Sequence, residues 1–485
     1  MTLVPAASVL SLAVDPRVVR RKVAWRILPL VFILYVIAYL DRANAGFAKL
    51  QMQETLKFSD AVFGWGFGIF FVGYLLLEIP GALLVEYWSA RKWFARILLT
   101  WGGCSMGMAL VRTPGQFYLA RFLLGLAEAG FFPGLIVYFT HWFPRADRGR
   151  AMAGMVLGVP VSVALGAQVS GWLLELDTFG LAGWQWVFLV EGFPAILFGL
   201  AVPFILTDRP SQAKWLTPSE RAWLQETLDA ERRESERSGA VTLGQAMRRP
   251  TVWLLALGIL ATNTGGYAML FWMPTTVQNL LKESRGTVSS SDVLTWTGLI
   301  YLCGLGGVWL SGQSSDRTGD RKWHCVAGQV LAGVFLAASV IPGQSWAGAF
   351  TWLCCFSFFA YFWPPPFWVL PTLTLSASAA AVSIGFINMC ANLSGVIGPP
   401  VVGQMKTAGW DDRTCLLVLA ACYAAGGGVI ALLRIPKSHP VLPPESALAP
   451  AQDGRRDTSI LSGERRDGIQ PPLDEQRFHD HRSSD

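Results

Sequence analysis

Long apolar runs, separated by short polar segments, recur along the whole chain. A run of about 20 apolar residues can cross about 30 Å of hydrocarbon as an α-helix. The runs predict six membrane-spanning helices over residues 27–47, 61–85, 93–111, 117–142, 151–174 and 186–206. Six more are predicted over residues 251–273, 292–310, 323–341, 346–370, 380–401 and 414–433. We therefore expect an all-α polytopic membrane protein with 12 transmembrane helices in two six-helix bundles.

The predicted helices divide the chain into five parts. These are an N-terminal segment (1–26), a first bundle (27–206), a central loop (207–250), a second bundle (251–433) and a tail (434–485). In the central loop, Thr217, Pro218 and Glu220 are an N-cap, a first-turn proline and a first-turn acid, which together predict a surface helix over about residues 217–236. The tail is rich in Pro, Ser and paired charges, so we expect it to be disordered.

Composition excludes several classes of protein. Hydrophobic residues make up 52% of the chain and charged residues only 15%, whereas a soluble protein carries about 25% charge. An outer-membrane barrel would show short alternating strands instead of long apolar runs. The net charge is +6, but no basic stripe with interleaved aromatic residues lies outside the apolar runs, so no nucleic-acid partner is expected. The eight cysteines lack metal-ligand spacing, and neither a metal nor a cofactor is expected.

Basic residues are concentrated in the loops on one side of the predicted topology. The loops after the second, fourth and eighth helices are basic, whereas those after the fifth and ninth contain no Lys or Arg. Short loops rich in Lys and Arg face the cytoplasm. We therefore expect a multi-pass protein of the cell membrane, in particular a bacterial inner membrane, with both termini in the cytoplasm.

Four ionisable side chains lie deep within predicted helices of the first half. Asp41 and Arg42 lie about 21 Å from the cytoplasmic end of their helix, at 1.5 Å per residue. Arg121 and Glu128 are seven residues apart on the fourth helix and share one face. Because such groups cost about 2.5–3.5 kcal/mol at mid-membrane, each is a functional candidate. We expect all four to converge on one cavity, where arginine can hold a carboxylate and the acids can exchange protons. Structural ion pairs between the two helices are the alternative.

Other polar positions within the apolar runs are weaker candidates. Asn388, in the eleventh helix, could bond a substrate or join two helices. Trp363 precedes three prolines, which must interrupt the tenth helix because they remove successive backbone donors. Irregular backbone in a membrane is tolerated only against protein or a cavity, so Trp363 is expected to line the site. Glu78 is expected to act at a gate or a helix end, and Glu191 can be structural or functional.

A loop motif resembles the signature of the major facilitator superfamily. It lies between the second and third helices of the second half and contains Asp316, Arg317, Gly319 and Arg321. Asp316 can pair across the helix ends, and Gly319 permits a tight reversal. The equivalent turn of the first half contains Arg91. The resemblance implies that these five residues gate one end of the protein.

Longer stretches resemble one branch of that superfamily, the anion:cation symporters, which carry organic anions with a cation, usually a proton. They include YLDRANAGFA at 39–48, RFLLGLAEAGFFPG at 121–134 and WVFLVEG at 186–192. The similarity extends over residues 20–435 and implies the major facilitator fold and alternating access. A membrane enzyme would need a nucleophile, base or metal cluster in the spans, and no such set is present in the sequence.

The resemblance also implies roles for particular residues. Asp41 and Glu128 match positions implicated in proton coupling. Arg42 and Arg121 match positions implicated in anion binding or gating, beside aromatic positions that match Tyr39 and Tyr74. We therefore expect a monomer that lies among membrane lipids and imports a small organic anion, a carboxylate, together with protons. Exchange or export of an anion by the same fold is the alternative.

Overall fold

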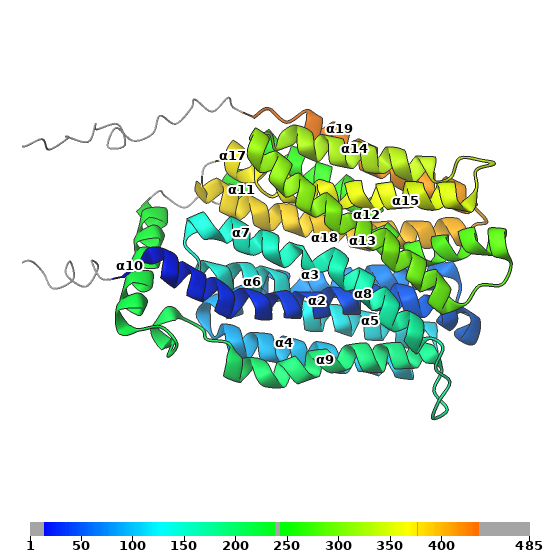
Figure 1. Cartoon of the computed structure of the whole chain (residues 1–485), viewed down its shortest axis with the longest axis horizontal. Helices are drawn as coiled ribbons and strands as arrows, with labels where there is room; N and C mark the ends of the chain where they lie inside the picture. The colour runs from blue at the N-terminus through cyan, green and yellow to red at the C-terminus, as the bar shows by residue number, and fades with distance from the viewer. Residues whose placement is uncertain (1–13, 238–242, 376, 436–485) are drawn as a thin grey trace, which may run out of the picture. The chain divides into compact units, whose positions relative to one another are not determined.

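The computed structural model describes residues 14–237, 243–375 and 377–435, and their regular structure is entirely helical (Figure 1). The predicted disorder of the tail concerns residues that lie almost entirely outside this described part.

Helices of the first half of the chain precede the central loop. They are α2 (Pro16–Leu56), α3 (Asp60–Tyr87), α4 (Ala90–Gly107), α5 (Pro114–Glu128), α6 (Phe131–Thr140), α7 (Arg145–Val156), α8 (Gly158–Leu173) and α9 (Gly183–Ile205). The central loop holds α10 (Pro218–Arg237) and α11 (Leu243–Met247). The second half contains α12 (Pro250–Arg285), α13 (Ser290–Thr318), α14 (Lys322–Ala338), α15 (Trp346–Phe362), α16 (Pro364–Phe367), α17 (Leu370–Thr374), α18 (Ala377–Thr407) and α19 (Asp412–Ala431).

Every predicted span coincides with a helix or with consecutive helices of the structure. Ten of these segments are long and apolar enough to cross a membrane, and α14 is a shorter apolar helix. The remaining segment, α4, carries Arg91, Lys92 and Arg96 near its start. The predicted all-α membrane architecture is therefore confirmed.

The first helix is longer than its apolar run predicts. It begins at Pro16, because Asp15 caps it by accepting a hydrogen bond from the backbone N–H of Arg17 (2.8 Å), and it continues to Leu56. Part of the predicted N-terminal segment, 1–26, is therefore helix. The predicted surface helix of the central loop is confirmed as α10, with Thr217 and Glu220 bonding each other's backbone N–H groups.

Three predicted spans are divided into shorter helices, the fifth span at Leu157 between α7 and α8. The fourth divides into α5 and α6 at Gly130, whose φ of 82° favours glycine and which lies directly against Gly81 of α3. The tenth divides into α15, α16 and α17 around Pro364, as the three consecutive prolines predict. The break in the fourth span follows Glu128 immediately, so this carboxyl group lies at the last residue of α5.

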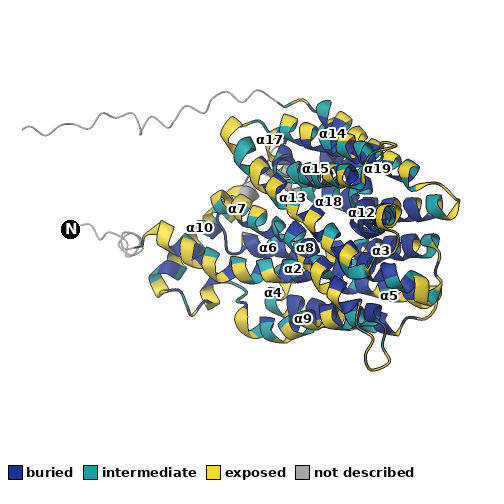
Figure 2. Ribbon diagram, turned by 45° about the vertical axis from the view of Figure 1, so that its right-hand side comes forward, coloured by how far each residue is buried: buried dark blue, intermediate teal, exposed yellow. Residues whose placement is uncertain are grey.

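The two halves pack against each other mainly through three helix pairs. Within the first half, α4 packs along α9 and α2 along α8; within the second, α12 and α14 pack along α19. Between the halves, α3 packs along α18, α8 along α13 and α2 against α12. Buried residues gather on the helix faces that point inwards, and exposed residues on the outer faces (Figure 2). The exposed residues include large apolar ones such as Leu76 and Phe204. Such an apolar exterior is suited to lipid.

Helix α10 is fixed to the first half by charged and aromatic contacts. The Lys22 ammonium lies 2.5 Å from a Glu220 carboxyl oxygen and lowers the pKa of that group, so this contact weakens as the pH falls. Arg145 and Arg148 bond to α10, and Trp142 stacks on Trp215 at 5.4 Å. We refer to this end of the helices as the α10 end.

Gly125 allows α5 to approach α3 closely, and replacing it should lower stability. A Cβ atom at residue 125 would overlap the backbone oxygen of Phe70. We expect Gly125→Ala to cost about 1–3 kcal/mol, as overpacking usually does, and to lower the thermal unfolding midpoint in detergent. Gly115→Ala, on the same helix, is the control because its Cβ would meet nothing within 4 Å. Equal midpoints for both variants would contradict the prediction.

Candidate functional site

A cavity of about 200 Å³ lies between the two halves. Ligand pockets typically measure about 300–1,000 Å³, so this one suits a small molecule. Its wall contains seven tyrosines: Tyr35, Tyr39, Tyr74, Tyr267, Tyr301, Tyr361 and Tyr423. The wall is therefore largely aromatic, with hydroxyl groups available for hydrogen bonds.

The charge of the cavity wall comes from one buried ion pair. Arg42 donates from Nε to Glu128 Oε1 at 2.7 Å, and its Nη2 lies 2.5 Å from the same oxygen. Among the described residues that line the cavity, Arg42 is the only Lys or Arg and Glu128 the only Asp or Glu. Glu128 Oε2 has no hydrogen-bond partner among the described atoms. The pair is thus incomplete and faces an open space.

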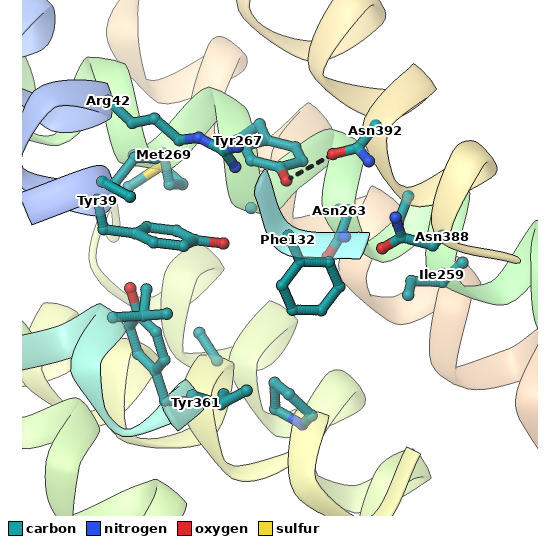
Figure 3. Close-up of a pocket in the computed structure, with 18 of the residues that line it drawn as sticks. Tyr39, Arg42, Phe132, Ile259, Asn263, Tyr267, Met269, Tyr361, Asn388 and Asn392 are labelled. Carbon is teal, nitrogen blue, oxygen red and sulfur yellow. Dashed lines mark hydrogen bonds between the residues drawn. The ribbon is translucent and has the colours of Figure 1, made fainter. Parts of the chain in front are cut away.

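Aromatic rings surround the Arg42 guanidinium. Its central carbon lies 4.9 Å from the ring centre of Tyr74, 5.1 Å from that of Tyr39 and 5.6 Å from that of Phe70. In Figure 3, Arg42 reaches towards Tyr267, and Tyr39 points across the cavity. Cation–π contacts of this kind stabilise and orient a desolvated cation. Tyr39 and Tyr74, which the family resemblance names as site positions, thus lie beside Arg42.

Amide side chains of the second half complete the wall. Tyr267 donates a hydrogen bond to Asn392 Oδ1 at 3.4 Å (Figure 3). Asn388 and Asn392 both donate to Glu78 Oε1 of α3, the latter at 3.2 Å. Asn388 therefore lines the cavity and also joins α18 to α3. Trp363 lines the cavity too, as the helix break predicts.

Asp41 and Arg121 lie behind the cavity wall. Asp41 accepts hydrogen bonds from Trp101 Nε1 (2.6 Å), Asn44 Nδ2 (3.1 Å) and the Ser105 hydroxyl. Arg121 donates from Nε to the backbone oxygen of Gly66 at 3.2 Å, and its two terminal nitrogens have no partner among the described atoms. Of the four predicted ionisable residues, the structure thus brings Arg42 and Glu128 together at the cavity.

The predicted gating residues lie at helix ends and in the short turn between α13 and α14, at the α10 end. Asp316 pairs with Arg321 at 2.7 Å, Gly319 ends α13 with a φ of 69°, and Arg317 is exposed. In the first half, Arg91 pairs with Asp208 at 3.3 Å, and its backbone N–H also bonds that carboxyl group. These contacts each join segments of the same half.

Lys49 is a buried cation that the sequence pattern did not indicate. Its Nζ lies 3.0 Å from Asp60 Oδ1, 2.8 Å from Gln53 Oε1 and 3.2 Å from the Thr275 hydroxyl. It also lies 4.6 Å from the ring centre of Trp272. Since Lys49 belongs to α2 and Trp272 to α12, these contacts join the two halves. We refer to this end as the Lys49 end.

Aromatic stacking closes the Lys49 end further. Phe67 of α3 stacks on Phe271 of α12 with ring centres 4.4 Å apart and planes 9° apart. Gly46 of α2 lies against the backbone of Phe271, and the Trp272 indole donates to the backbone oxygen of Pro399 at 3.3 Å. The described conformation is therefore tightly packed between this end and the cavity.

Removing the counter-charge of Lys49 should open this end. Asp60→Asn leaves a buried ammonium without a carboxylate, which typically costs about 3–5 kcal/mol, and separation of the halves would hydrate it. We expect spin labels at Thr55 and Lys282 to show a new population of longer distances. Lys49→Met on top of Asp60→Asn should restore the original distribution, because it removes the unpaired charge. An unchanged distribution in Asp60→Asn would contradict the prediction.

Comparison with known proteins identifies the family of this fold. The model of the Major Facilitator Superfamily matches residues 31–399. The chain belongs to this superfamily. A "Putative tartrate transporter" of Agrobacterium vitis is 43% identical over 393 residues, which cover 80% of this chain and 88% of the relative. The "Inner membrane transport protein RhmT" of Escherichia coli is 35% identical and covers 84% of this chain and 94% of the relative.

Other relatives agree with this assignment. A "Putative metabolite transport protein NicT" of Pseudomonas putida is 36% identical, and the match covers 83% of this chain and 91% of the relative. A crystal structure of a bacterial homolog to the human lysosomal transporter Spinster matches the fold with a TM-score of 0.62 at 19% identity, covering 86% of this chain and 95% of that chain. This major facilitator protein is thus a membrane transporter and not an enzyme, and its relatives support the organic-anion branch to which its motifs point.

Proposed function

We propose that this protein is a secondary active transporter that imports a small organic anion, a carboxylate, together with protons by alternating access. The observation that supports it is the buried Arg42–Glu128 ion pair on the wall of a cavity between the two halves. The name of the Agrobacterium vitis relative, which refers to tartrate, supports a carboxylate as the ligand.

The ion pair suggests how an anion and a proton are coupled. Arginine presents a planar fork that matches two carboxylate oxygens. While Glu128 is ionised, it occupies that fork from within the protein. A proton on Glu128 removes the competing charge and frees Arg42 for the substrate carboxylate. Loss of that proton restores the internal pair and displaces the anion. Binding of proton and anion therefore favour each other.

Alternating access requires the cavity to open to one side at a time. We propose that the Lys49 end faces outwards and the α10 end faces the cytoplasm, because the basic turns with Arg91 and Arg317 lie at the α10 end. The chain then lies in the cell membrane with both termini in the cytoplasm. In the described conformation, the contacts of Lys49 and Phe67 with the second half close the outer side.

The residues around the ion pair take supporting roles in this proposal. Tyr39 and Tyr74 orient Arg42, and Asn388 and Trp363 shape the opposite wall.

Residues away from the cavity also have roles in this proposal. Arg121 attracts the anion on its way from the outer side, since its terminal nitrogens are free to bind it. Asp41 takes up a proton within the first half. The turn residues Asp316, Arg317, Gly319, Arg321 and Arg91 hold the inner side during the change of conformation.

Uptake into proteoliposomes tests the proposal. Purified protein is reconstituted, a proton gradient is imposed, and a panel of labelled hydroxy, dicarboxylic and aromatic acids is supplied. We expect saturable accumulation of one acid that an uncoupler abolishes. Accumulation that ignores the proton gradient but requires an opposing anion would instead assign the protein to exchange. Outward pumping of the acid would assign it to export.

A further inference from the structure

A second buried carboxyl group lies close to Asp41, away from the cavity. Glu191 of α9 is 2% exposed, and its Oε1 accepts a hydrogen bond of 2.5 Å from the Ser170 hydroxyl of α8. Its other oxygen, Oε2, is buried without a partner among the described atoms. Among the described residues, no cationic side chain forms an ion pair with Glu191, so one neutral hydroxyl is its observed donor.

The two acids differ in how many donors surround them. Asp41 accepts from Trp101, Asn44 and Ser105, which suits an ionised carboxylate with its several acceptor positions. Glu191 has a single donor and a bare oxygen, which suits a neutral acid with one O–H group. An isolated buried carboxylate would be very costly, and such groups bind a proton instead.

Asn44 connects the two acids. Its Nδ2 donates to Asp41 Oδ1 at 3.1 Å, and its side chain lies near the Glu191 carboxyl group, although the described atoms show no hydrogen bond between them. Asn44 Oδ1 is buried without a partner, as is Glu191 Oε2. Both atoms are acceptors. Without a proton on Glu191, these two oxygens are both acceptors and have no donor. A proton on Glu191 Oε2 supplies one.

Within the described part of the chain, no Lys or Arg forms an ion pair with Glu191. Asp41 of α2 is the acid that acts on it electrostatically, and α8 contributes Ser170. Cys104 of α4 lies near Asp41, with Arg96 beyond it. Arg121 of α5 acts on Asp41. Since like charges oppose one another, the charge on Asp41 bears on whether Glu191 can be charged as well.

The hydroxyl donor of Glu191 lies on a helix that contacts the other half. Ser170 is followed by Gly171, whose missing side chain would lie 3.3 Å from Leu294 and from Ser291 of α13. Gly298 of α13 likewise lies against α8 near Gln168. Alternating access must alter this contact between α8 and α13. A movement of α8 that shifts Ser170 would change the stability of the proton on Glu191.

From this arrangement we propose that Glu191 is a second proton-binding site, which takes up and releases one proton in each transport cycle and is coupled to Asp41 through Asn44. The inference rests on the proposed proton-coupled function. It assigns to Glu191 a role separate from that of Glu128, which lies at the cavity and pairs with Arg42.

Infrared difference spectroscopy of the lipid-reconstituted protein tests proton binding without substrate. We expect a carboxylic-acid C=O band that appears and disappears with pH and is absent from Glu191→Gln. In Ser170→Ala the band should move to higher frequency, because its carbonyl loses a hydrogen bond, and this variant also identifies the band if Glu191→Gln does not fold. The absence of a titrating band that responds to both substitutions would overturn the proposal.

The proton-to-acid ratio tests the role in transport. We expect Glu191→Gln to carry one proton fewer per acid than the wild type in parallel measurements of proton and acid flux. An unchanged ratio would overturn the proposal. Acid transport without proton movement in the wild type would overturn the proposed function instead, and the infrared band would then still decide whether Glu191 binds a proton reversibly.

Discussion

Arg42→Ala should reduce acid uptake by about 30-fold or more, since losing one partner of a buried charged contact costs about 2–5 kcal/mol and tenfold corresponds to about 1.4 kcal/mol. Arg42 is the only Lys or Arg among the described lining residues, so no other cation on the wall can replace it. Uptake of the labelled acid into proteoliposomes, normalised to the amount of reconstituted protein, measures the effect.

Two further variants separate charge from geometry. Arg42→Lys keeps the positive charge but not the planar fork, so we expect uptake between that of the wild type and that of Arg42→Ala. Arg112→Ala removes an exposed arginine outside the cavity and should leave uptake unchanged. Wild-type uptake by Arg42→Ala would show that the anion binds elsewhere.

Glu128→Gln should uncouple the transporter from the proton gradient. The amide keeps the shape of the side chain but cannot exchange a proton or compete as an anion for Arg42. We expect loss of gradient-driven accumulation with retention of acid counterflow between equal concentrations. Wild-type affinity for the acid should fall as the pH rises, by up to about tenfold per pH unit for one linked proton, whereas the variant should bind independently of pH.

A titration series distinguishes this effect from misfolding. Binding of the acid is measured by calorimetry at several pH values for wild type, Glu128→Gln and Glu175→Gln. Glu175 is exposed outside the cavity, so its variant should follow the wild type. If Glu128→Gln still accumulates acid against its gradient, Glu128 is not the coupling group.

Helix geometry explains which part of the site could be predicted from the sequence. Because the rise per residue is fixed, the depths of the ionisable residues along their helices can be calculated, and that calculation led to the expectation that they meet in one region. The particular pairing of Arg42 with Glu128 was not predicted. Arg121 is seven residues from Glu128, or about 10 Å along the helix. Arg121 instead donates to the backbone oxygen of Gly66 behind the wall, so sharing a face with Glu128 was not sufficient to bring it to the cavity.

Other features depend on partners that only the tertiary structure supplies. Polar residues after Phe47 end the apolar run, yet α2 continues because Lys49 meets Asp60 from the next helix and Trp272 from the second half. The tyrosines of the second half, such as Tyr301 and Tyr361, follow no pattern that distinguishes a cavity wall from ordinary packing. The prolines after Trp363 did predict the helix break, since their effect on the backbone is local.

The placement of the cavity's ionisable groups has an electrical consequence. Among the described lining residues, Arg42 and Glu128 both belong to the first half, while the second half contributes amides and aromatic rings. Moving one elementary charge through the membrane is worth about 2.3 kcal/mol per 100 mV. A bound monovalent anion and the proton on Glu128 together add no net charge. A membrane voltage would therefore not drive the transport of this pair. Any additional proton carried by the first half would be drawn inwards, and the voltage would act on transport through that proton alone.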